Sequence, residues 1–465
     1  MEIKQQHSVY VQKIQEQMKY FFANHQKVKI YHGSTTSTRS QKFEKGKFVD
    51  ISSLNQVIEI NNAEQYVLVE PNVPMDKLIE QTLQHNLIPP VVPEYPGITV
   101  GGSIQGGAGE SSSFKFGGVH DCCLEYEIIL GNGEIITASP TQNKDLFYGT
   151  ACSYGSLGII TLIKLRLIPA KDFVHLKYFP IRSFDETIGL IEKNIGETAD
   201  FIDAILFEKN RGTIMIGNFS DKKDLPISTF TKASDEWFYI HVNKISKKVS
   251  FYEEIIPIRD YLFRYDRGAF WLGRYAFSFF KIPFTRFTRF LLNRAFKTRV
   301  LSRVGQTTNV SQKYFVQDFC LPKENILDFL EFIDEELHIY PLWLVPLRPA
   351  GSFDKLSPNY IKTDLVINVG VWGRVDGDYF KVNRKLENKL TGLKGRKVLY
   401  AHAYYPRDEF WKIYDYSWYN QLREKYFATS VFPDIYDKTK VSEKYKPTIL
   451  SGILKALRSS KVPIS

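Results

Sequence analysis

The chain contains few cysteines and no long run of apolar residues. Only four of its 465 residues are Cys, and no two of them have CxxC spacing, so the sequence predicts neither a disulfide framework nor a metal site. The first residues lack the apolar core of a signal peptide. No apolar run approaches the roughly 18 residues that a membrane-spanning helix needs. We therefore expect a cytoplasmic protein that is soluble or bound peripherally to a membrane.

Two common nucleotide-binding motifs are also missing. The dinucleotide-binding fingerprint needs GxGxxG between a strand and a helix, with an acidic residue about twenty positions further on. The segment from Gly102 to Gly107 has the glycines without that spacing, and no Walker loop is present. The sequence also contains no internal repeat and no low-complexity tract.

Composition narrows the class of protein but does not identify its partner. Hydrophobic residues make up 43% and charged residues 24% of the chain, as in ordinary globular proteins, and the length predicts two or three domains. An aromatic content of 14% favours either a large apolar ligand cavity or a thick aromatic core. The net charge of +10 suggests an anionic partner such as a membrane surface, nucleic acid or a phosphorylated cofactor, although nothing else supports nucleic acid.

Hydrophobic periodicity predicts a mixture of helices and strands. An apolar stripe marks a helix over residues 8–27, and Asn132-Gly133 predicts a hairpin because Asn-Gly tolerates positive φ. Further helices are expected over Asp76–Asn86, Glu324–Leu337 and Asp408–Lys425, with a helix start at Asp145. Strands are expected over Val28–Tyr31, Phe48–Ile51, Val57–Ile60, Tyr66–Glu70, Glu125–Leu130, Glu134–Ala138, Ile159–Ile168, Ala204–Phe207, Thr213–Ile216 and Val398–Ala403.

The most informative segment is the stretch from Gly97 to Ser113, which is rich in glycine and serine. Glycine lets the backbone approach a ligand closely, and successive N–H groups form concavities that bind anions. Val100 and Ile104 stand between the glycines, which distinguishes the stretch from a flexible linker. We interpret it as a cofactor loop, although its glycines do not identify the cofactor.

Two further segments accompany this loop. His32–Arg39 follows a predicted strand and offers amides, hydroxyls and Arg39 to a pyrophosphate, and Gly155–Gly158 forms a turn after Asp145–Tyr148. In this order the three segments resemble the vanillyl-alcohol oxidase / p-cresol methylhydroxylase (PCMH-type) family of FAD enzymes. In that family, two loops hold the FAD pyrophosphate and a later turn runs beside the cofactor.

The resemblance narrows to the 24-dehydrocholesterol reductase branch, the delta(24)-sterol reductases, over roughly residues 28–440. The motifs that carry it are Thr99–Gly117, Asp145–Tyr148, Arg166–Lys171, Tyr314–Asp318, His338–Leu344, Arg407–Trp411, Leu422–Lys425 and Val431–Lys438. It implies an α+β fold with an N-terminal helix over 1–21 and a two-part FAD-binding domain over 22–172. A substrate cap domain would span 173–395, and a C-terminal segment over 396–465 would complete the FAD domain.

The same resemblance implies a non-covalent FAD site. Relatives that tether FAD use a His in the first loop or a Cys before the second, and this chain has neither at those places. We therefore interpret His32, which precedes the first loop, as structural. The expected FAD-binding residues are Gly33, Ser34, Thr35, Thr36, Ser37, Thr99, Val100, Gly101, Gly102, Ser103, Ile104, Gln105, Gly106, Gly107, Ala108, Gly109, Glu110, Ser111, Ser112, Gly155, Gly158 and Ile159.

The implied reaction reduces the C24=C25 double bond of a sterol side chain, with NADPH as the electron donor. Because this alkene is unactivated, we expect an acid to protonate C24 while hydride from the flavin quenches positive charge at C25. The candidate catalytic residues are His402, Glu110, Gln317 and Tyr404, with Asp318 and Tyr314 as further acids.

Each of these assignments has an alternative. Glu110 could cap a helix or pair with Lys115, and His402 could be a packed strand histidine instead of a donor to reduced flavin. Gln317 is similar to a cap-strand glutamine that faces flavin and substrate in related oxidases. Since no motif for NADPH is visible, an FAD-dependent oxidase or dehydrogenase of an alcohol, a sugar or a polyprenyl-linked sugar stays an alternative function.

Residues 271–304 carry eight basic side chains and no acidic one. Pro283 suits a helix start, and Phe280, Phe284, Phe287 and Leu291 would fall on one helical face. A basic helix with an aromatic face is typical of interfacial membrane binding. An internal cap helix with solvated arginines is the alternative.

Overall fold

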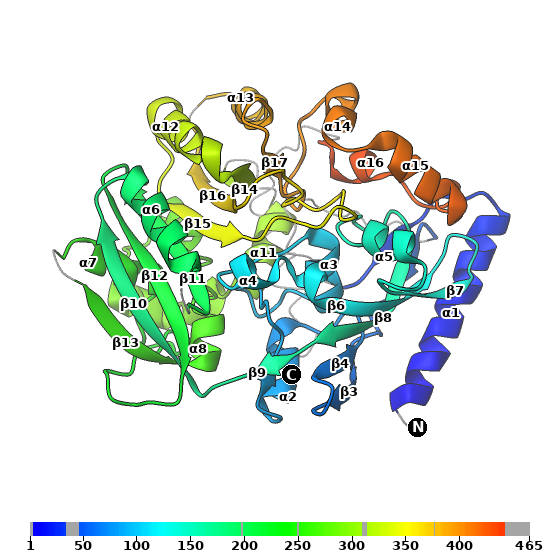
Figure 1. The fold of residues 1–465 in the computed structure, drawn as a ribbon, viewed down its shortest axis with the longest axis horizontal. Coiled ribbons are helices and arrows are strands. Elements are labelled where there is room, and N and C mark those ends of the chain that lie inside the picture. The colour runs from blue at the N-terminus through cyan, green and yellow to red at the C-terminus, as the bar shows by residue number, and fades with distance from the viewer. Residues whose placement is uncertain are drawn as a thin grey trace.

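The fold contains two antiparallel sheets, one of five strands and one of eight. The computed structural model describes residues 3–33, 46–196, 199–248, 251–308, 314–375 and 377–441. Figure 1 shows the eight-stranded sheet on the left and the five-stranded sheet on the right. The C-terminal segment, drawn in orange and red above the five-stranded sheet, contains α14 (Arg407–Ile413), α15 (Tyr416–Lys425) and α16 (Ile435–Thr439). The predicted α+β class is confirmed.

The five-stranded sheet has the order β3-β4-β8-β6-β7. Its strands are β3 (Val57–Asn61), β4 (Tyr66–Val69), β6 (Cys123–Ile129), β7 (Ile135–Ala138) and β8 (Ile159–Arg166). β6 and β7 form the predicted hairpin, in which Gly133 adopts a φ of +85°. Around this sheet lie the parallel pair β1 (Lys29–Tyr31) and β2 (Phe48–Asp50), the pair β5 (Leu87–Ile88) and β9 (Ile168–Pro169), and helices α2 (Met75–Leu83) and α5 (Lys144–Thr150).

The eight-stranded sheet has the order β13-β10-β12-β11-β15-β16-β14-β17. Its strands are β10 (Phe173–Ile181), β11 (Phe201–Glu208), β12 (Arg211–Ser220), β13 (Tyr252–Pro257), β14 (Tyr314–Pro322), β15 (Leu342–Leu347), β16 (Val366–Arg374) and β17 (Arg396–Lys397). Between β12 and β14 the chain also forms α7 (Phe238–Ser246) and α8 (Ile258–Leu262).

The two faces of the eight-stranded sheet pack against different partners. One face is covered by α6 (Phe184–Ile195), α12 (Ile326–Glu336) and α13 (Tyr379–Gly392), whose buried side chains form one apolar core with the strands. The opposite face carries Trp343 and Trp372, which pack on Phe270 with ring centroids 5.0 and 4.3 Å apart. Because side chains alternate along a strand, every second residue of β14, β15 and β16 points toward this aromatic side.

Two predictions about helices in the N-terminal and C-terminal parts need correction. The segment from Gly97 to Ser113 is not a continuous loop, since it contains α3 (Val100–Gly106) and leads into α4 (Ser113–Phe116). The helix begins there because the Thr99 hydroxyl accepts a hydrogen bond from the Gly102 N–H at 3.2 Å. The single helix expected over Asp408–Lys425 is two helices, because Asp415 accepts the Trp418 N–H at 3.0 Å and starts α15.

Two further predictions fail in the second half of the chain. The strand expected over Val398–Ala403 does not form, because pairing with β14 ends at Lys397. Phe280, Phe284, Phe287 and Leu291 do not share one helical face, because Phe280 and Phe284 lie outside the helices of this segment. Residues 271–304 do not form one amphipathic helix. They fold instead into α9 (Leu272–Phe279), α10 (Arg286–Leu291), a 3₁₀ turn at Asn293–Phe296 and the start of α11 (Thr298–Thr308).

The N-terminal helix α1 (Ile3–Ala23) packs on the five-stranded sheet through the predicted stripe of Val11, Ile14, Met18 and Phe21. Within the described residues, no helix combines the length and the apolar character needed to cross a bilayer. His7 joins α1 to the sheet, because its Nδ1 lies 2.7 Å from Glu70 Oε1 and its Nε2 lies 3.3 Å from Glu127 Oε1. Burial opposes protonation of His7, but the two carboxylates outweigh it and raise its pKa from 6.5 to about 9.

This ion pair predicts a pH-dependent stability. Because the pKa of His7 is higher in the folded protein, its contribution is fully present below pH 6.5 and is lost as the pH rises through about 9. The free energy of unfolding should fall over this window by on the order of 3 kcal/mol more in the parent protein than in His7→Leu. Chemical denaturation at both ends of the window measures this change in the free energy of unfolding. An equal change in the two proteins would contradict the proposed contribution of His7.

Candidate active site

A cavity of about 620 Å³ lies between the two sheets. Its wall combines α3, the turn at residues 154–160, the C-terminal segment around 433–440, and the aromatic side of β14, β15 and β16. The volume is typical of sites for cofactors and small molecules. The glycine-rich stretch and the later turn that the sequence singled out therefore line one chamber, whereas Ser34, Thr35, Thr36 and Ser37 of the first loop lie outside the described residues.

Two glycines of α3 present bare backbone to the cavity. Gly102 and Gly106 are four residues apart and share one face of the helix, and both line the cavity. A Cβ atom on Gly106 would meet no atom within 4 Å, so a side chain there would extend into the cavity. Gly101 has a structural role, because a Cβ on it would lie 2.6 Å from Pro71 Cβ. Any ligand beside this face of α3 would touch backbone atoms directly.

The turn at residues 153–158 is fixed to α3 by a side chain. Gln105 Oε1 accepts hydrogen bonds from the Gly155 N–H at 2.8 Å and the Ser153 hydroxyl at 3.1 Å. Gly155 has a φ of +68°, and a Cβ on it would lie 2.7 Å from Ile30 Cδ1 of β1. The turn is therefore held between α3 and β1, where its backbone closes one side of the cavity.

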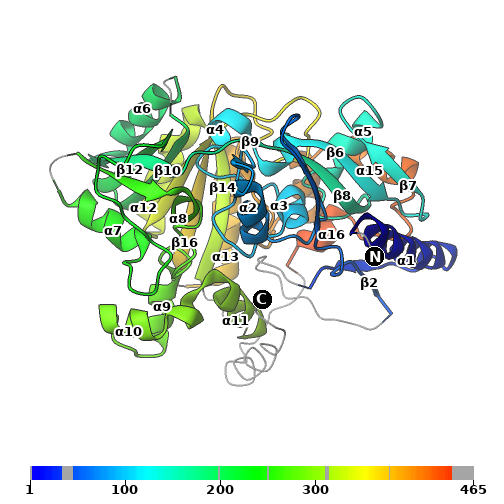
Figure 2. The same ribbon diagram turned by 90° about the horizontal axis from the view of Figure 1, so that it is seen from below.

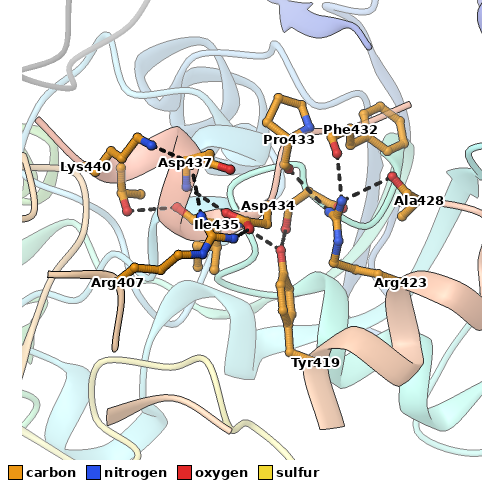
Figure 3. Close-up of polar contacts among 12 residues, drawn as sticks. Arg407, Tyr419, Arg423, Ala428, Phe432, Pro433, Asp434, Ile435, Asp437 and Lys440 are labelled. Atoms are coloured by element: carbon orange, nitrogen blue, oxygen red, sulfur yellow. Dashed lines mark hydrogen bonds and ion pairs between the residues drawn. The ribbon is translucent and has the colours of Figure 1, made fainter. Parts of the chain in front are cut away.

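The C-terminal segment is anchored on the same turn, and Figure 3 shows how Arg423 and Tyr419 also hold this segment together. The buried guanidinium of Arg423 donates to the carbonyl oxygen of Ser156 at 2.5 Å and to that of Phe432 at 2.7 Å. The Tyr419 hydroxyl lies 2.7 Å from Ser156 Oγ and accepts the Ile435 N–H at 2.9 Å. These bonds place the chain from 433 to 440 against the cofactor-loop side of the cavity.

One end of the cavity is basic. Lys29, His32, Lys438 and Lys440 line it, together with Asp437, which pairs with Lys440 at 2.6 Å. Burial and then the charge of Lys438 lower the pKa of His32. The buried Nδ1 of His32 has no hydrogen-bond partner in the structure. His32, which we interpret from the sequence as structural, thus lines a chamber whose charge suits a phosphate-containing ligand, and its role stays a prediction.

The other end of the cavity contains a fixed carboxyl group. Asp318 of β14 accepts a hydrogen bond from Tyr400 at 2.5 Å on one oxygen and from the Asn368 amide at 2.9 Å on the other. All three residues line the cavity. Burial raises the pKa of Asp318, whereas its bonds to Tyr400 and Asn368 act in the opposite direction.

A second carboxyl group faces the same end. Glu94 lines the cavity between the buried Pro93 and the half-buried Tyr95. Burial raises the pKa of Glu94 to about 8, and the charges of Glu110 and Asp318 act in the same direction. Around it stand the aromatic rings of Tyr95, Trp343 and Trp372, whose faces attract positive charge. This end can hold a proton at neutral pH beside an apolar ligand.

His402 lines the cavity on a segment held by a buried ion pair. Lys397 Nζ lies 2.9 Å from Glu387 Oε1 and 2.6 Å from the carbonyl oxygen of His402, and the Tyr404 N–H donates to the same Glu387 oxygen at 2.8 Å. Ala403 then bridges to Lys440. His402 therefore lies between the eight-stranded sheet, which we call the cap sheet, and the C-terminal segment. This position does not require the predicted strand.

Several predicted site residues lie outside the cavity wall. Gln317 alternates with Val316 and Asp318 on β14, so its side chain points to the opposite face of the sheet and donates to Asn383 of α13. Tyr404 packs against Tyr379 and Phe380. The described residues Gly33, Val100, Ile104, Glu110, Ser111, Ser112 and Tyr314 also do not line it, whereas Thr99, Gly101, Gly102, Ser103, Gln105–Gly109, Gly155, Gly158 and Ile159 do.

Glu110 belongs to a buried network that joins the two halves of the protein. Arg264 lies 2.9 Å from Glu110 and 3.0 Å from Asp203 of β11, and its side chain is fully buried. Asp203 also accepts hydrogen bonds from Tyr265 at 2.6 Å and Trp343 at 3.0 Å. The carboxylate of Glu110 is therefore engaged in an ion pair, so the prediction that it faces a substrate does not fit this geometry.

Sequence reasoning missed Glu94, Tyr400, Asn368 and Lys438 as cavity residues. Glu94 had a usable signal, because it directly follows the apolar run Leu87–Pro93, and a carboxyl group there enters a nonpolar environment. The other three had none, since their positions depend on where distant segments cross.

Comparison with known proteins agrees with this geometry. Residues 10–139 match the family model described as an FAD binding domain. The chain is 30% identical over 414 residues to Delta(24)-sterol reductase of Mus musculus, covering 87% of this chain and 80% of that protein. The corresponding human protein is 29% identical over 411 residues, with the same coverage. That of Arabidopsis thaliana is 27% identical over 447 residues, covering 87% of this chain and 78% of the relative.

The chain belongs to the delta(24)-sterol reductase family. The resemblance seen in the sequence motifs is thereby confirmed, as is FAD as the cofactor of its N-terminal domain. In this family member the FAD binding domain includes α3 with its glycine face. The cavity wall contributed by β14 to β16 lies outside the part matched by that model.

Gly106→Val should abolish retention of FAD, because the new side chain would occupy space beside α3 that the cofactor needs, while its Cβ would meet no protein atom within 4 Å. Gly189→Val is the matched control, since Gly189 is an exposed helical glycine of α6 that also has no atom within 4 Å of a built Cβ. FAD released by acid from each purified protein gives the measurement. Equal FAD contents would remove this face of α3 from the cofactor site, and flavin left on the precipitated polypeptide would contradict non-covalent binding.

Proposed function

We propose that this protein is an FAD-dependent reductase of the C24=C25 double bond in sterol side chains, with NADPH as electron donor. The observation that carries this proposal is the two-ended cavity, with a glycine-lined, basic end and an acidic, aromatic end in one chamber. Family membership supports the reaction class, because the relatives named above are Delta(24)-sterol reductases.

The residues of the basic end fit a bound FAD. Gly102 and Gly106 allow backbone contact, and Lys29, Lys438 and Lys440 supply positive charge for a pyrophosphate. We expect the cofactor to be held without a covalent bond. When bound, the flavin supplies hydride transfer from NADPH to the sterol. His402, which borders both ends, is placed to donate a hydrogen bond or positive charge to the reduced form.

We assign proton donation to Glu94. A general acid works best when its pKa lies near the working pH, and burial raises the pKa of Glu94 to about 8. Asp318 differs, because both of its oxygens already accept hydrogen bonds. Asp318 is therefore suited to a fixed position beside the positive charge that develops at C25, while Glu94 transfers its proton to C24. The faces of Trp343 and Trp372 stabilise the same positive charge.

An anaerobic titration tests the proposed function. NADPH should bleach the yellow protein, and a sterol with a C24=C25 double bond, such as desmosterol, should restore the colour with formation of the saturated side chain. Reoxidation by oxygen or a quinone, but not by the sterol, would instead support the oxidase or dehydrogenase alternative. A protein that NADPH does not reduce would contradict the assignment of the electron donor.

Glu94→Gln should slow reoxidation by the sterol about a hundredfold, because it removes the proton donor. Its reduction by NADPH should stay near the parent rate. In the parent protein, reoxidation should be fastest below pH 8 and decline above it, since the acid form of Glu94 is lost as the pH passes its pKa of about 8. Glu94→Gln should lack this decline.

Stopped-flow measurement of the two half-reactions gives both results. Glu125→Gln, a half-buried carboxyl group of β6 outside the cavity wall, serves as control. An unchanged reoxidation rate and pH profile in Glu94→Gln would overturn the assignment of Glu94 as proton donor. Slow reoxidation in Asp318→Asn alone would transfer the role of acid to Asp318.

A further inference from the structure

Large apolar side chains are exposed at the outer end of the cap. Phe279 and Phe280 end α9, and α10 exposes Phe287, Phe290 and Leu291, whose exposed fractions reach 71% for Phe287 and 69% for Leu291. Residues 287, 290 and 291 share one face of α10. Figure 2 shows α9 beside the eight-stranded sheet and α10 at the lower edge of the molecule, beyond α9. We call these five residues the aromatic tip.

The segment between α9 and α10 is packed against the rest of the cap. Phe284, between the two helices, turns inward and packs on Trp237 and Phe277 with ring centroids 5.5 and 5.1 Å apart. Arg289 stacks on Phe284 at 4.7 Å. The five residues of the aromatic tip therefore do not belong to the cap core, which is packed by Phe284 and its neighbours.

The segment that carries the aromatic tip is also rich in basic residues. The chain contains no Asp or Glu between Asp266 and Asp318. Arg274, Lys281, Arg294 and Lys297 are exposed, and none forms an ion pair within the described part of the chain. Projecting aromatic residues with unneutralised basic neighbours are the combination that enters the interface of an anionic bilayer.

We propose that the aromatic tip docks this protein on an anionic lipid bilayer. Charge complementarity favours this occupant over a second copy of the chain, because two copies of one basic surface would repel each other. Docking would also bring the cavity close to a sterol in the membrane, a link that rests on the proposed function. Arg299 of α11 binds Asp76 at 2.7 Å, and its side chain lies beside Gly97 of the cavity wall. The basic segment therefore adjoins the chamber that a membrane-borne sterol would enter.

Flotation of the FAD-loaded full chain tests docking with phosphatidylcholine vesicles that contain or lack phosphatidylserine. The parent protein should float with the anionic vesicles, and salt should weaken its binding. Lys281→Glu/Arg294→Glu should lower partition at least about thirtyfold, since each basic residue near such a surface contributes about a fivefold change. Phe287→Ser/Leu291→Ser should lower it at least about tenfold through lost apolar burial.

Matched controls lie elsewhere on the surface. Tyr20→Ser/Leu124→Ser removes exposed apolar groups of α1 and β6, and Lys13→Glu/Lys412→Glu makes the same change of net charge. Both should float like the parent. Equal flotation of all variants, or no binding by the parent, would overturn the proposal. So would a parent dimer that dissociates in Phe287→Ser/Leu291→Ser, because the aromatic tip would then be an interface between copies.

A pair of activity assays separates docking from the reaction. Variants of the aromatic tip should lose turnover of sterol in anionic vesicles yet keep parent turnover of sterol delivered by cyclodextrin. Equal losses in both assays would overturn the link between docking and substrate entry. If the parent reduces no sterol from cyclodextrin, the proposed function fails, whereas flotation still decides whether the bilayer is the partner.

Discussion

The buried guanidinium of Arg264 is the interaction on which the arrangement of the cavity depends. It pairs with Glu110, which follows the cofactor stretch, and with Asp203 on the cap sheet. We call this contact between the cofactor stretch and the eight-stranded sheet the seam. Two backbone hydrogen bonds reinforce it, from the Ile202 N–H to the Ser111 carbonyl at 2.8 Å and from the Arg348 N–H to the Ser113 carbonyl at 3.0 Å. Removing one partner of such a buried pair leaves an uncompensated charge and costs about 3–5 kcal/mol. The seam therefore fixes the distance between the glycine face of α3 and the aromatic side of the cap sheet.

This seam explains why one chamber can serve two ligands. The basic end is built from α3, β1 and the C-terminal segment. The acidic end is built from β14 to β16, the segment after β17 and the segment before α3 that carries Glu94. His402 and the Ala403 bridge to Lys440 lie where the two ends meet. The high aromatic content serves both purposes that the composition left open, because Trp343 and Trp372 line the cavity while Trp237 and Phe277 fill the cap core.

The sequence predicts the parts of the site that depend on local chemistry. The glycines of α3, the hairpin at Asn132 and the turn at Gly155 follow from backbone requirements that few residues satisfy. The order of the motifs was also sufficient to identify the family and its cofactor. The failures concern geometry set by distant contacts. Gln317 was placed on the wrong face because the phase of a strand depends on its neighbours, and Glu110 was taken as an acid because its partner, Arg264, lies 154 residues away along the chain.

An experimental structure with FAD and a C24=C25 sterol tests the central claim most directly. We expect the pyrophosphate to lie against Gly102 and Gly106, and the sterol double bond to lie among Trp343, Trp372 and Asp318. A carboxyl oxygen of Glu94 should lie within about 3.5 Å of C24, as a near-attack geometry requires. A sterol bound outside this chamber, or a double bond out of reach of Glu94 and Asp318 alike, would contradict this claim.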